Sequence, residues 1–284
     1  MAWAARDGRA RPAIFAGVTA CAVAIVALVP RLAQDPRYHR FADTRRLLGV
    51  PNALDVLSNA GFAIVGAWGL AAVGSATFVD RRERLPWWLL FAAVALTGAG
   101  SAWYHLHPTN ASLVWDRLPM TLGFMGLLAA LVGERVSVRW GVALLGPLAL
   151  LGTASVGYWA LTEARGAGDL RPYLLVQLYP LAAVPLLLSL FPARYTRGAE
   201  LLVALAWYLA AKVVEGHDAE IFHALGFVSG HTLKHLFATA GAASLVRMLV
   251  GREPMLAGAH ASSSHRALRI GSCRNAGRPP KPWQ

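Results

Sequence analysis

Residues Pro86 to His105 read PWWLLFAAVALTGAGSAWYH, an apolar run that ends in a histidine. In a helix, which rises 1.5 Å per residue, about 20 residues cover the roughly 30 Å hydrocarbon core of a bilayer. The run contains no Asp, Glu, Lys or Arg, so His105 stands out at its end. Ionisable side chains are costly in a bilayer, and those present usually face a cavity and have a function. The stretch therefore predicts a membrane-spanning helix that leads to a functional site.

Similar apolar runs recur along the whole chain. Of the 284 residues, 56% are hydrophobic and only 15% are charged, whereas a soluble domain carries about 25% charged residues. The composition and the spacing of the runs predict an all-α polytopic membrane protein. We expect eight spans, over Ala13–Pro30, Leu54–Val73, Pro86–His105, Leu113–Gly133, Val138–Leu161, Pro172–Phe191, Ala199–Val214 and Ser229–Leu249.

The spans divide the chain into four segments. Residues 1–30 form a basic N-terminus with the first span, which follows three arginines as the core of a signal peptide would. The length of this span favours a membrane helix that is retained over a signal peptide that is cleaved. Residues 31–53 form a linker on the non-cytoplasmic side, and residues 54–250 form the membrane domain. Residues 251–284 are rich in Ser, Gly, Arg and Pro and are predicted to be a disordered basic tail. Cys21 and Cys273 are too far apart in this plan to form a disulfide.

The basic residues indicate the orientation in the membrane. The net charge of +12 would favour nucleic-acid binding in a soluble protein. Here the arginines gather in alternate loops and in both terminal segments, which is the pattern of cytoplasmic segments. We therefore expect no nucleic-acid partner and both termini in the cytoplasm. The membrane would be the plasma membrane of a bacterium, or the ER or Golgi membrane of a eukaryote.

Three histidines and one aspartate are predicted to meet at the non-cytoplasmic end. His105 ends an outward span, Asp116 begins the next span, and His231 and His235 lie near the start of an inward span. Residues four apart share one face of a helix, so His231 and His235 can bind one metal ion together. With His105 they offer three imidazoles, which leaves one position of a zinc ion open, as in catalytic zinc sites.

Two polar residues accompany the histidines. Asp116 could accept a proton from a metal-bound water and pass it to a leaving amine, or it could merely cap a helix or pair with Arg117. The hydroxyl of Ser101 could stabilise a developing oxyanion, or it could bond a backbone carbonyl one turn back. His107 competes with His105 as the third ligand, although Pro108 indicates that the helix has ended there.

Other ionisable residues favour structural roles. We expect Lys234 to extend towards the interface or to pair with an acid, for which the candidates are Glu215, Asp218 and Glu220. His217 and His223 should be exposed in an outer loop. At the opposite end of the bundle, Glu134 and Arg135 should form an interfacial pair.

The pattern of these residues resembles the alkaline ceramidase family, within a wider superfamily of seven-span membrane hydrolases that includes the adiponectin and progestin receptors. The resemblance runs from about Asp43 to Leu249. It is carried by Ser101 four residues before His105, by Asp116 eleven residues after His105, and by the His231–His235 pair. Ser58 and Asn59 also fall where the family has Ser-Asn in its first core span.

The resemblance implies a zinc-dependent amidase that cleaves ceramide-like lipids into a sphingoid base and a fatty acid. Its catalytic residues would be Ser101 and Asp116, and its metal ligands would be His105, His231 and His235. The fold would be a seven-helix core with one extra N-terminal helix. The family's calcium-binding segment corresponds to residues 41–55, whose only carboxylates are Asp43 and Asp55. Calcium needs six to eight oxygen ligands, so this segment argues against calcium.

Two other functions remain open from the sequence. A receptor-like or regulatory protein could retain zinc for structure, and a haem protein could use the histidines as axial ligands. The His231–His235 pair with a nearby Asp116 favours zinc over haem. For the hydrolase the expected partners are a lipid amide substrate and membrane lipids, and no protein partner can be inferred. Lys234 stands where some relatives have an aromatic residue, which leaves the substrate headgroup open.

Overall fold

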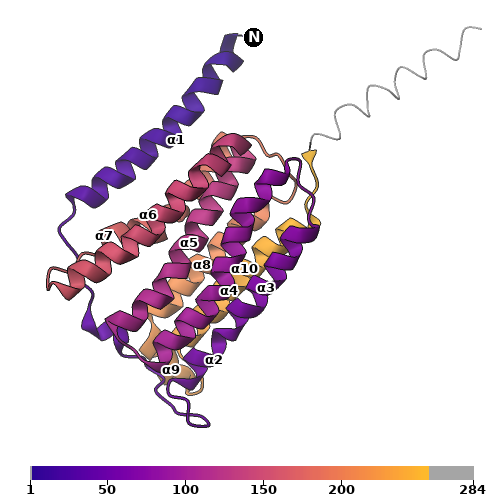
Figure 1. The fold of residues 1–284 in the computed structure, drawn as a ribbon. Coiled ribbons are helices and arrows are strands. Elements are labelled where there is room, and N and C mark those ends of the chain that lie inside the picture. The colour runs from indigo at the N-terminus through magenta and orange to yellow at the C-terminus, as the bar shows by residue number, and fades with distance from the viewer. Residues whose placement is uncertain (1, 256–284) are drawn as a thin grey trace, which may run out of the picture.

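The computed structural model describes residues 2–255, and its regular elements are helices (Figure 1). In chain order these are α1 (Ala2–Leu28), η1 (Pro36–His39), α2 (Ala53–Ser58), α3 (Ala60–Ser75), η2 (Arg81–Glu83), α4 (Arg84–Leu106), α5 (Asn110–Arg135), α6 (Val138–Ala164), α7 (Arg171–Leu190), α8 (Ala199–Gly216), α9 (Asp218–Leu225) and α10 (Gly230–Gly251).

The helices confirm an all-α multi-pass membrane protein. Among residues 2–255, seven segments are long and apolar enough to cross a membrane, and the helix near the N-terminus is one of them. Each predicted span corresponds to one helix, except that the second is divided at Asn59 into α2 and α3. The seven do not include α8, which carries Glu200, Lys212 and Glu215, yet α8 packs within the bundle against α10.

The bundle is arranged around a central space. The segments α3, α4, α5, α7, α8 and α10 follow one another around it, with α2 continuing the line of α3 (Figure 1). Outside this ring, α6 packs on α5 and α7. The N-terminal helix α1 lies apart from the bundle and contacts it mainly through α7 (Figure 1). Its apolar residues are largely exposed, as expected for a helix that faces lipid.

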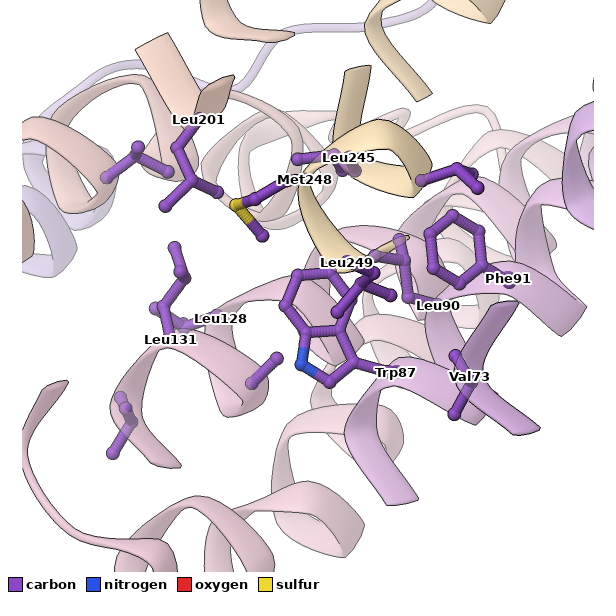
Figure 2. Packing of buried hydrophobic residues seen from close by; sticks show 14 of the residues in the cluster. Val73, Trp87, Leu90, Phe91, Leu128, Leu131, Leu201, Leu245, Met248 and Leu249 are labelled. Carbon is purple, nitrogen blue, oxygen red and sulfur yellow. The ribbon is translucent and has the colours of Figure 1, made fainter. Parts of the chain in front are cut away.

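One end of the bundle is closed by a dense apolar cluster, which we call the far end. Trp87 and Phe91 of α4 are fully buried and stack at 6.1 Å between ring centroids. Side chains of α5, α8 and α10, such as Leu131, Leu201 and Leu249, pack around them (Figure 2). Because lipid is as apolar as these side chains, close packing rather than water exclusion stabilises such a core.

The far end corrects two sequence-based predictions. Glu134 does not pair with its neighbour Arg135. It binds the guanidinium of Arg252, which is 3% exposed, and it also accepts a hydrogen bond of 3.0 Å from the Trp87 indole. Residues 251–255, which the sequence assigned to the disordered tail, are part of the packed structure: α10 ends at Gly251, and the backbone N–H of Met255 donates to the carbonyl of Arg194. The rest of the predicted tail, with Cys273, lies outside the described residues.

The opposite end, which we call the histidine end, is covered by the segment 31–52 and by α9. The sequence predicts only a linker over residues 31–53. Instead Gln34 bonds Arg117 of α5 at 2.6 Å, and Phe41 is buried against Tyr104 of α4. Arg117 lies among the rings of Trp159 and Tyr173 as well, at 4.2 and 4.5 Å. The segment is therefore part of the packed structure at this end.

Candidate metal centre

The ends of two helices bring the histidines together. His105 lies in the last turn of α4, and α10 begins at Gly230, so His231 and His235 occupy its first turns. The hydroxyl of Ser229 caps α10 by accepting a hydrogen bond of 3.0 Å from the backbone N–H of Thr232. This cap fixes where the helix starts, and it therefore fixes which face carries the two histidines.

The three imidazoles form a buried cluster. Each offers one nitrogen, and the three nitrogens lie within 4.8 Å of one another. Nε2 of His105 lies 3.3 Å from Nε2 of His235, and Nδ1 of His105 has no hydrogen-bond partner among the described residues. The three side chains are 1%, 5% and 2% exposed, in sequence order. Buried imidazoles that converge in this way have the donor atoms and the proximity to hold one metal ion.

Partners outside the cluster orient the histidines. Ser58 of α2 bonds Nδ1 of His235 at 2.8 Å, which leaves Nε2 free to face the other rings. The carboxylate of Asp218 accepts from the backbone N–H of His231 at 2.7 Å, and the amide of Asn52 donates to the carbonyl of His105 at 2.8 Å. Such second-layer contacts are a regular feature of metal sites because they fix the orientation of each ligand.

Two glycines allow the helices to approach closely enough. A Cβ added at Gly100 would clash with the backbone of Trp115, which precedes Asp116 on α5. A Cβ added at Gly230 would clash with the carbonyl of Val214 and with the backbone of Asp218. Glycine at these positions therefore lets α4 meet α5 and lets α10 meet the junction of α8 and α9.

An apolar cavity of about 190 Å³ begins beside the cluster and extends between the helices towards the far end. For comparison, a dry cavity of about 150 Å³ admits benzene. At the histidine end its wall is polar and includes Ser101, Asp116, Lys234 and His235. The rest of its wall is mainly apolar and includes Leu90, Val94, Phe124, Leu127, Leu205 and Leu245. The cavity can therefore hold an apolar chain with a polar group beside the histidines.

The structure argues against both structural roles considered for Asp116. Thr109 caps α5 in a reciprocal capping box with Ser112, so Asp116 lies in the second turn and does not cap the helix. Arg117 turns away to Gln34, so it does not pair with Asp116 either. Asp116 is 6% exposed and faces the cavity. A buried carboxylate placed there is available for proton transfer.

Ser101 also faces the cavity. Thr97, one turn earlier, bonds the carbonyl of Ala93 at 2.9 Å. Within residues 2–255 the Ser101 hydroxyl makes no such backbone bond, and it lines the cavity one turn before His105. His107, the rival to His105, is the exposed residue that follows the end of α4. The structure thus groups Ser101, Asp116 and the three histidines and leaves His107 outside.

Lys234 pairs with an acid, as expected. Its ammonium lies 3.0 Å from Glu215 of α8, and Glu215 also binds Lys212. Lys234 lies 2.9 Å from Nε2 of His231 as well. The lone pair of Nε2 can accept from Lys234 or bind a metal ion, but it cannot do both. Metal binding through Nε2 of His231 therefore requires Lys234 to turn towards Glu215. His217 and His223 are exposed, as predicted.

The segment 31–52 closes the site from outside. Phe41 lies over two of the imidazoles, at 4.7 Å from His105 and 4.9 Å from His231 between ring centroids. Arg45 binds Asp43 through two hydrogen bonds of 2.7 Å and bonds the carbonyl of Phe227 at 2.8 Å. The Arg45 guanidinium lowers the pKa of Asp43. Arg45 thus links this segment to the loop before α10 and engages one of the two carboxylates considered for calcium.

Comparison of the chain with protein-family models, curated proteins and solved structures gives no match. The resemblance to alkaline ceramidases therefore stays a prediction, and function must be inferred from the residues of the site.

Sequence reasoning missed several residues that shape the site. Phe41 and Asn52 come from the segment 31–52 and Asp218 begins α9; no local pattern indicates that these residues contact the histidines or their helices. Asp55 is fully buried, where it accepts a hydrogen bond of 2.6 Å from Thr232. The sequence did contain an indication that Asp55 is part of the site, because a carboxylate at the start of an apolar span usually has a function.

Proposed function

We propose that this protein is an intramembrane zinc-dependent hydrolase that cleaves the amide bond of a lipid. The observation that carries the proposal is the buried cluster of His105, His231 and His235 at the polar end of an apolar cavity. Ser101 and Asp116 line the same end. Three histidines suit a catalytic zinc site, because they leave a position open for water.

Each part of the site has a chemical role in this proposal. A zinc ion held by the three histidines would supply the Lewis acid that activates water and polarises the carbonyl. The apolar part of the cavity would hold the acyl chain, which can enter from the bilayer. The Ser101 hydroxyl would donate a hydrogen bond to the carbonyl oxygen as negative charge develops on it.

Asp116 would move the proton. Its carboxylate would accept a proton from the attacking water and deliver it to the nitrogen of the leaving amine. In the balanced reaction the water oxygen bonds to the carbonyl carbon, the carbon–nitrogen bond breaks, and the products are a fatty acid and an amine. Arg117 binds Gln34 rather than Asp116, and within residues 2–255 Asp116 forms no ion pair, although Lys234 lines the same end of the cavity.

The proposal includes the membrane arrangement. The charge pattern supports cytoplasmic termini and, with them, a histidine end at the non-cytoplasmic surface. A second candidate, a zinc-retaining receptor-like or regulatory protein, would keep the metal without turnover. A haem is disfavoured, because three imidazoles converge within 4.8 Å and Phe41 covers two of them.

Metal analysis of purified protein tests the ligand assignment. We expect about one zinc per chain, lost in His231→Ala and in His235→Ala, because two imidazoles are too few for a tight site. His107→Ala is the matched control, since it removes an exposed histidine two residues from a ligand and should keep zinc. Normal zinc content in both ligand variants would refute the assignment.

Hydrolysis of lipid amides tests the chemistry. Turnover should disappear on chelation and return with zinc. Asp116→Asn should keep zinc and lose roughly 10²–10⁴-fold in kcat, whereas Ser101→Ala should keep zinc and lose less. Zinc without turnover on any lipid amide would favour the receptor-like alternative.

A further inference from the structure

Beside the histidines, one wall of the cavity carries three charged residues and a tyrosine that the proposed mechanism does not use. We call Tyr38, Lys212, Glu215 and Lys234 the lysine cluster, and all four line the cavity. Glu215 lies at its centre. One of its oxygens accepts from Lys234 at 3.0 Å and from the Tyr38 hydroxyl at 3.4 Å, and the other binds Lys212.

The hydrogen bonds of the cluster leave only donors for a ligand. Both oxygens of Glu215 are engaged, so its carboxylate has little capacity left for a substrate. Each ammonium carries three donors. Lys212 uses one on Glu215, and Lys234 uses one on Glu215; the donor that Lys234 directs at His231 is released when that nitrogen binds a metal. Within the lysine cluster, two lysines against one glutamate leave one positive charge; Asp116, the proposed proton acceptor, lines the same end of the cavity as a separate carboxylate.

A wall of this kind favours an anion over a neutral headgroup. A hydroxyl both donates and accepts, whereas a carboxylate accepts only and gains from the positive charge. The side chain of Lys234 is 17% exposed and that of Lys212 is 36% exposed. Both can therefore meet a ligand in the cavity while they remain bound to Glu215.

The position of Lys234 sets how far the anion lies from the amide. Its ammonium is 2.9 Å from the ring of His231, so it stands directly beside the cluster that would hold the reacting carbonyl. A carboxylate on the carbon next to the amide nitrogen lies only a few bonds from the carbonyl, so it suits a cation placed beside the histidines.

We infer that the substrates are N-acyl α-amino acids, with Lys234 and Lys212 binding the carboxylate and the apolar cavity binding the acyl chain. This inference rests on the proposed hydrolase function. Water adds to the carbonyl carbon, the carbon–nitrogen bond breaks, and the products are a fatty acid and a free amino acid. No oxidant or reductant is required.

A pair of matched substrates tests the inference. N-palmitoylglycine and N-palmitoylethanolamine share the acyl chain and the amide, and they differ in a carboxylate against a hydroxymethyl group. We expect zinc-loaded protein to have a kcat/KM roughly 10- to 100-fold higher for N-palmitoylglycine, the usual range for charge-assisted hydrogen bonds. Lys212→Gln and Lys234→Gln should reduce this ratio, chiefly by raising the KM for N-palmitoylglycine. Arg139→Gln, which removes an exposed positive charge elsewhere, is the control and should keep the ratio.

The outcomes separate the inference from the proposed function. Equal turnover of both substrates, or a ratio unchanged by Lys212→Gln, would overturn the inference and leave the hydrolase intact. An equal loss of kcat on both substrates in Lys234→Gln would also overturn it, because the lysine would then act on the carbonyl.

Binding provides a second measurement if no lipid amide is hydrolysed, in which case the proposed function fails. Titration of the purified protein with each palmitoyl amide, followed by tryptophan fluorescence, then measures the ligand preference directly. Tighter binding of N-palmitoylglycine that is lost in Lys212→Gln would support the assigned ligand class, and equal binding of the two amides would overturn it.

Discussion

Replacement of Arg252 by Met should be among the most destabilising single changes in this protein. The Arg252 side chain is fully buried, that of Glu134 is 7% exposed, and the two form an ion pair. Removing one partner of such a pair leaves an uncompensated charge, which costs about 3–5 kcal/mol. Arg252 also lies over the rings of Tyr195 and Phe78, at 4.1 and 4.6 Å, so its loss removes further favourable contacts.

The partner variant should cost less. In Glu134→Gln the side-chain oxygen can still accept from Trp87 and from Arg252, so we expect a loss near the lower end of that range, about 3 kcal/mol. The double variant Glu134→Gln with Arg252→Met removes both charges of this pair, while Glu83 and Arg194 keep their own pair nearby. It should lose at least about 1 kcal/mol less than the sum of the single variants, because the two residues are in contact.

Equilibrium unfolding in detergent, followed by tryptophan fluorescence, measures these free energies. Arg135→Met is the control, because the one hydrogen bond of the Arg135 side chain within residues 2–255 is a long bond of 3.4 Å to the carbonyl of Phe191, so its loss should cost about 1 kcal/mol or less. If Arg135→Met is as destabilising as Arg252→Met, or if the coupling in the double variant is zero, then Glu134 does not depend on Arg252 and our description of the far end is wrong.

Three further predictions concern close packing, pH and orientation. Gly100→Ala should reduce zinc content and the free energy of unfolding, because the added Cβ pushes α4 away from α5. Gly157→Ala is the control: its Cβ would meet nothing within 4 Å, so this variant should be neutral or slightly stabilising. Equal effects of the two variants in unfolding and metal assays would contradict the close approach of α4 and α5. The Arg171 guanidinium lowers the pKa of Asp169 to about 2, so its stabilising contribution is present above an unfolded pKa of about 3.9 and is lost as the pH falls towards 2. The difference in unfolding free energy between wild type and Asp169→Asn should therefore shrink over that range, and a constant difference would refute the pairing. Reporter fusions at Arg82 should report the cytoplasm and those at Asn110 the opposite side, and the reverse result would invert the orientation.

The sequence predicted the parts of the site that local periodicity controls. His231 and His235 share a helix face because they are four residues apart, and alternating spans brought His105 and Asp116 to the same end. These rules need only helix geometry and the direction of each span. The same rules placed the start of α5 three residues late, at Leu113 rather than at Asn110, because the polar residues of its capping box resemble a loop.

The sequence could not predict contacts between distant segments. The sequence predicts that Glu134 pairs with its neighbour Arg135, because nothing local indicates that Arg252, which directly follows α10, binds Glu134 of α5. The short helix α9 was read as an outer loop, since its eight residues fall within polar surroundings. Likewise, the contacts of Phe41 with two imidazoles arise only when the segment 31–52 docks on the bundle.

The placement of Phe41 has a kinetic consequence. Its ring lies over His105 and His231, and the segment is held by a bond of 2.9 Å from the backbone N–H of Ala42 to Asp218. We expect a chelator in water to reach the imidazoles after this segment lifts, so the rate of metal removal should level off as chelator concentration rises. The plateau would be the opening rate of the segment, and Phe41→Ala should raise it. In the cell, the metal would then be acquired most easily before residues 31–52 dock.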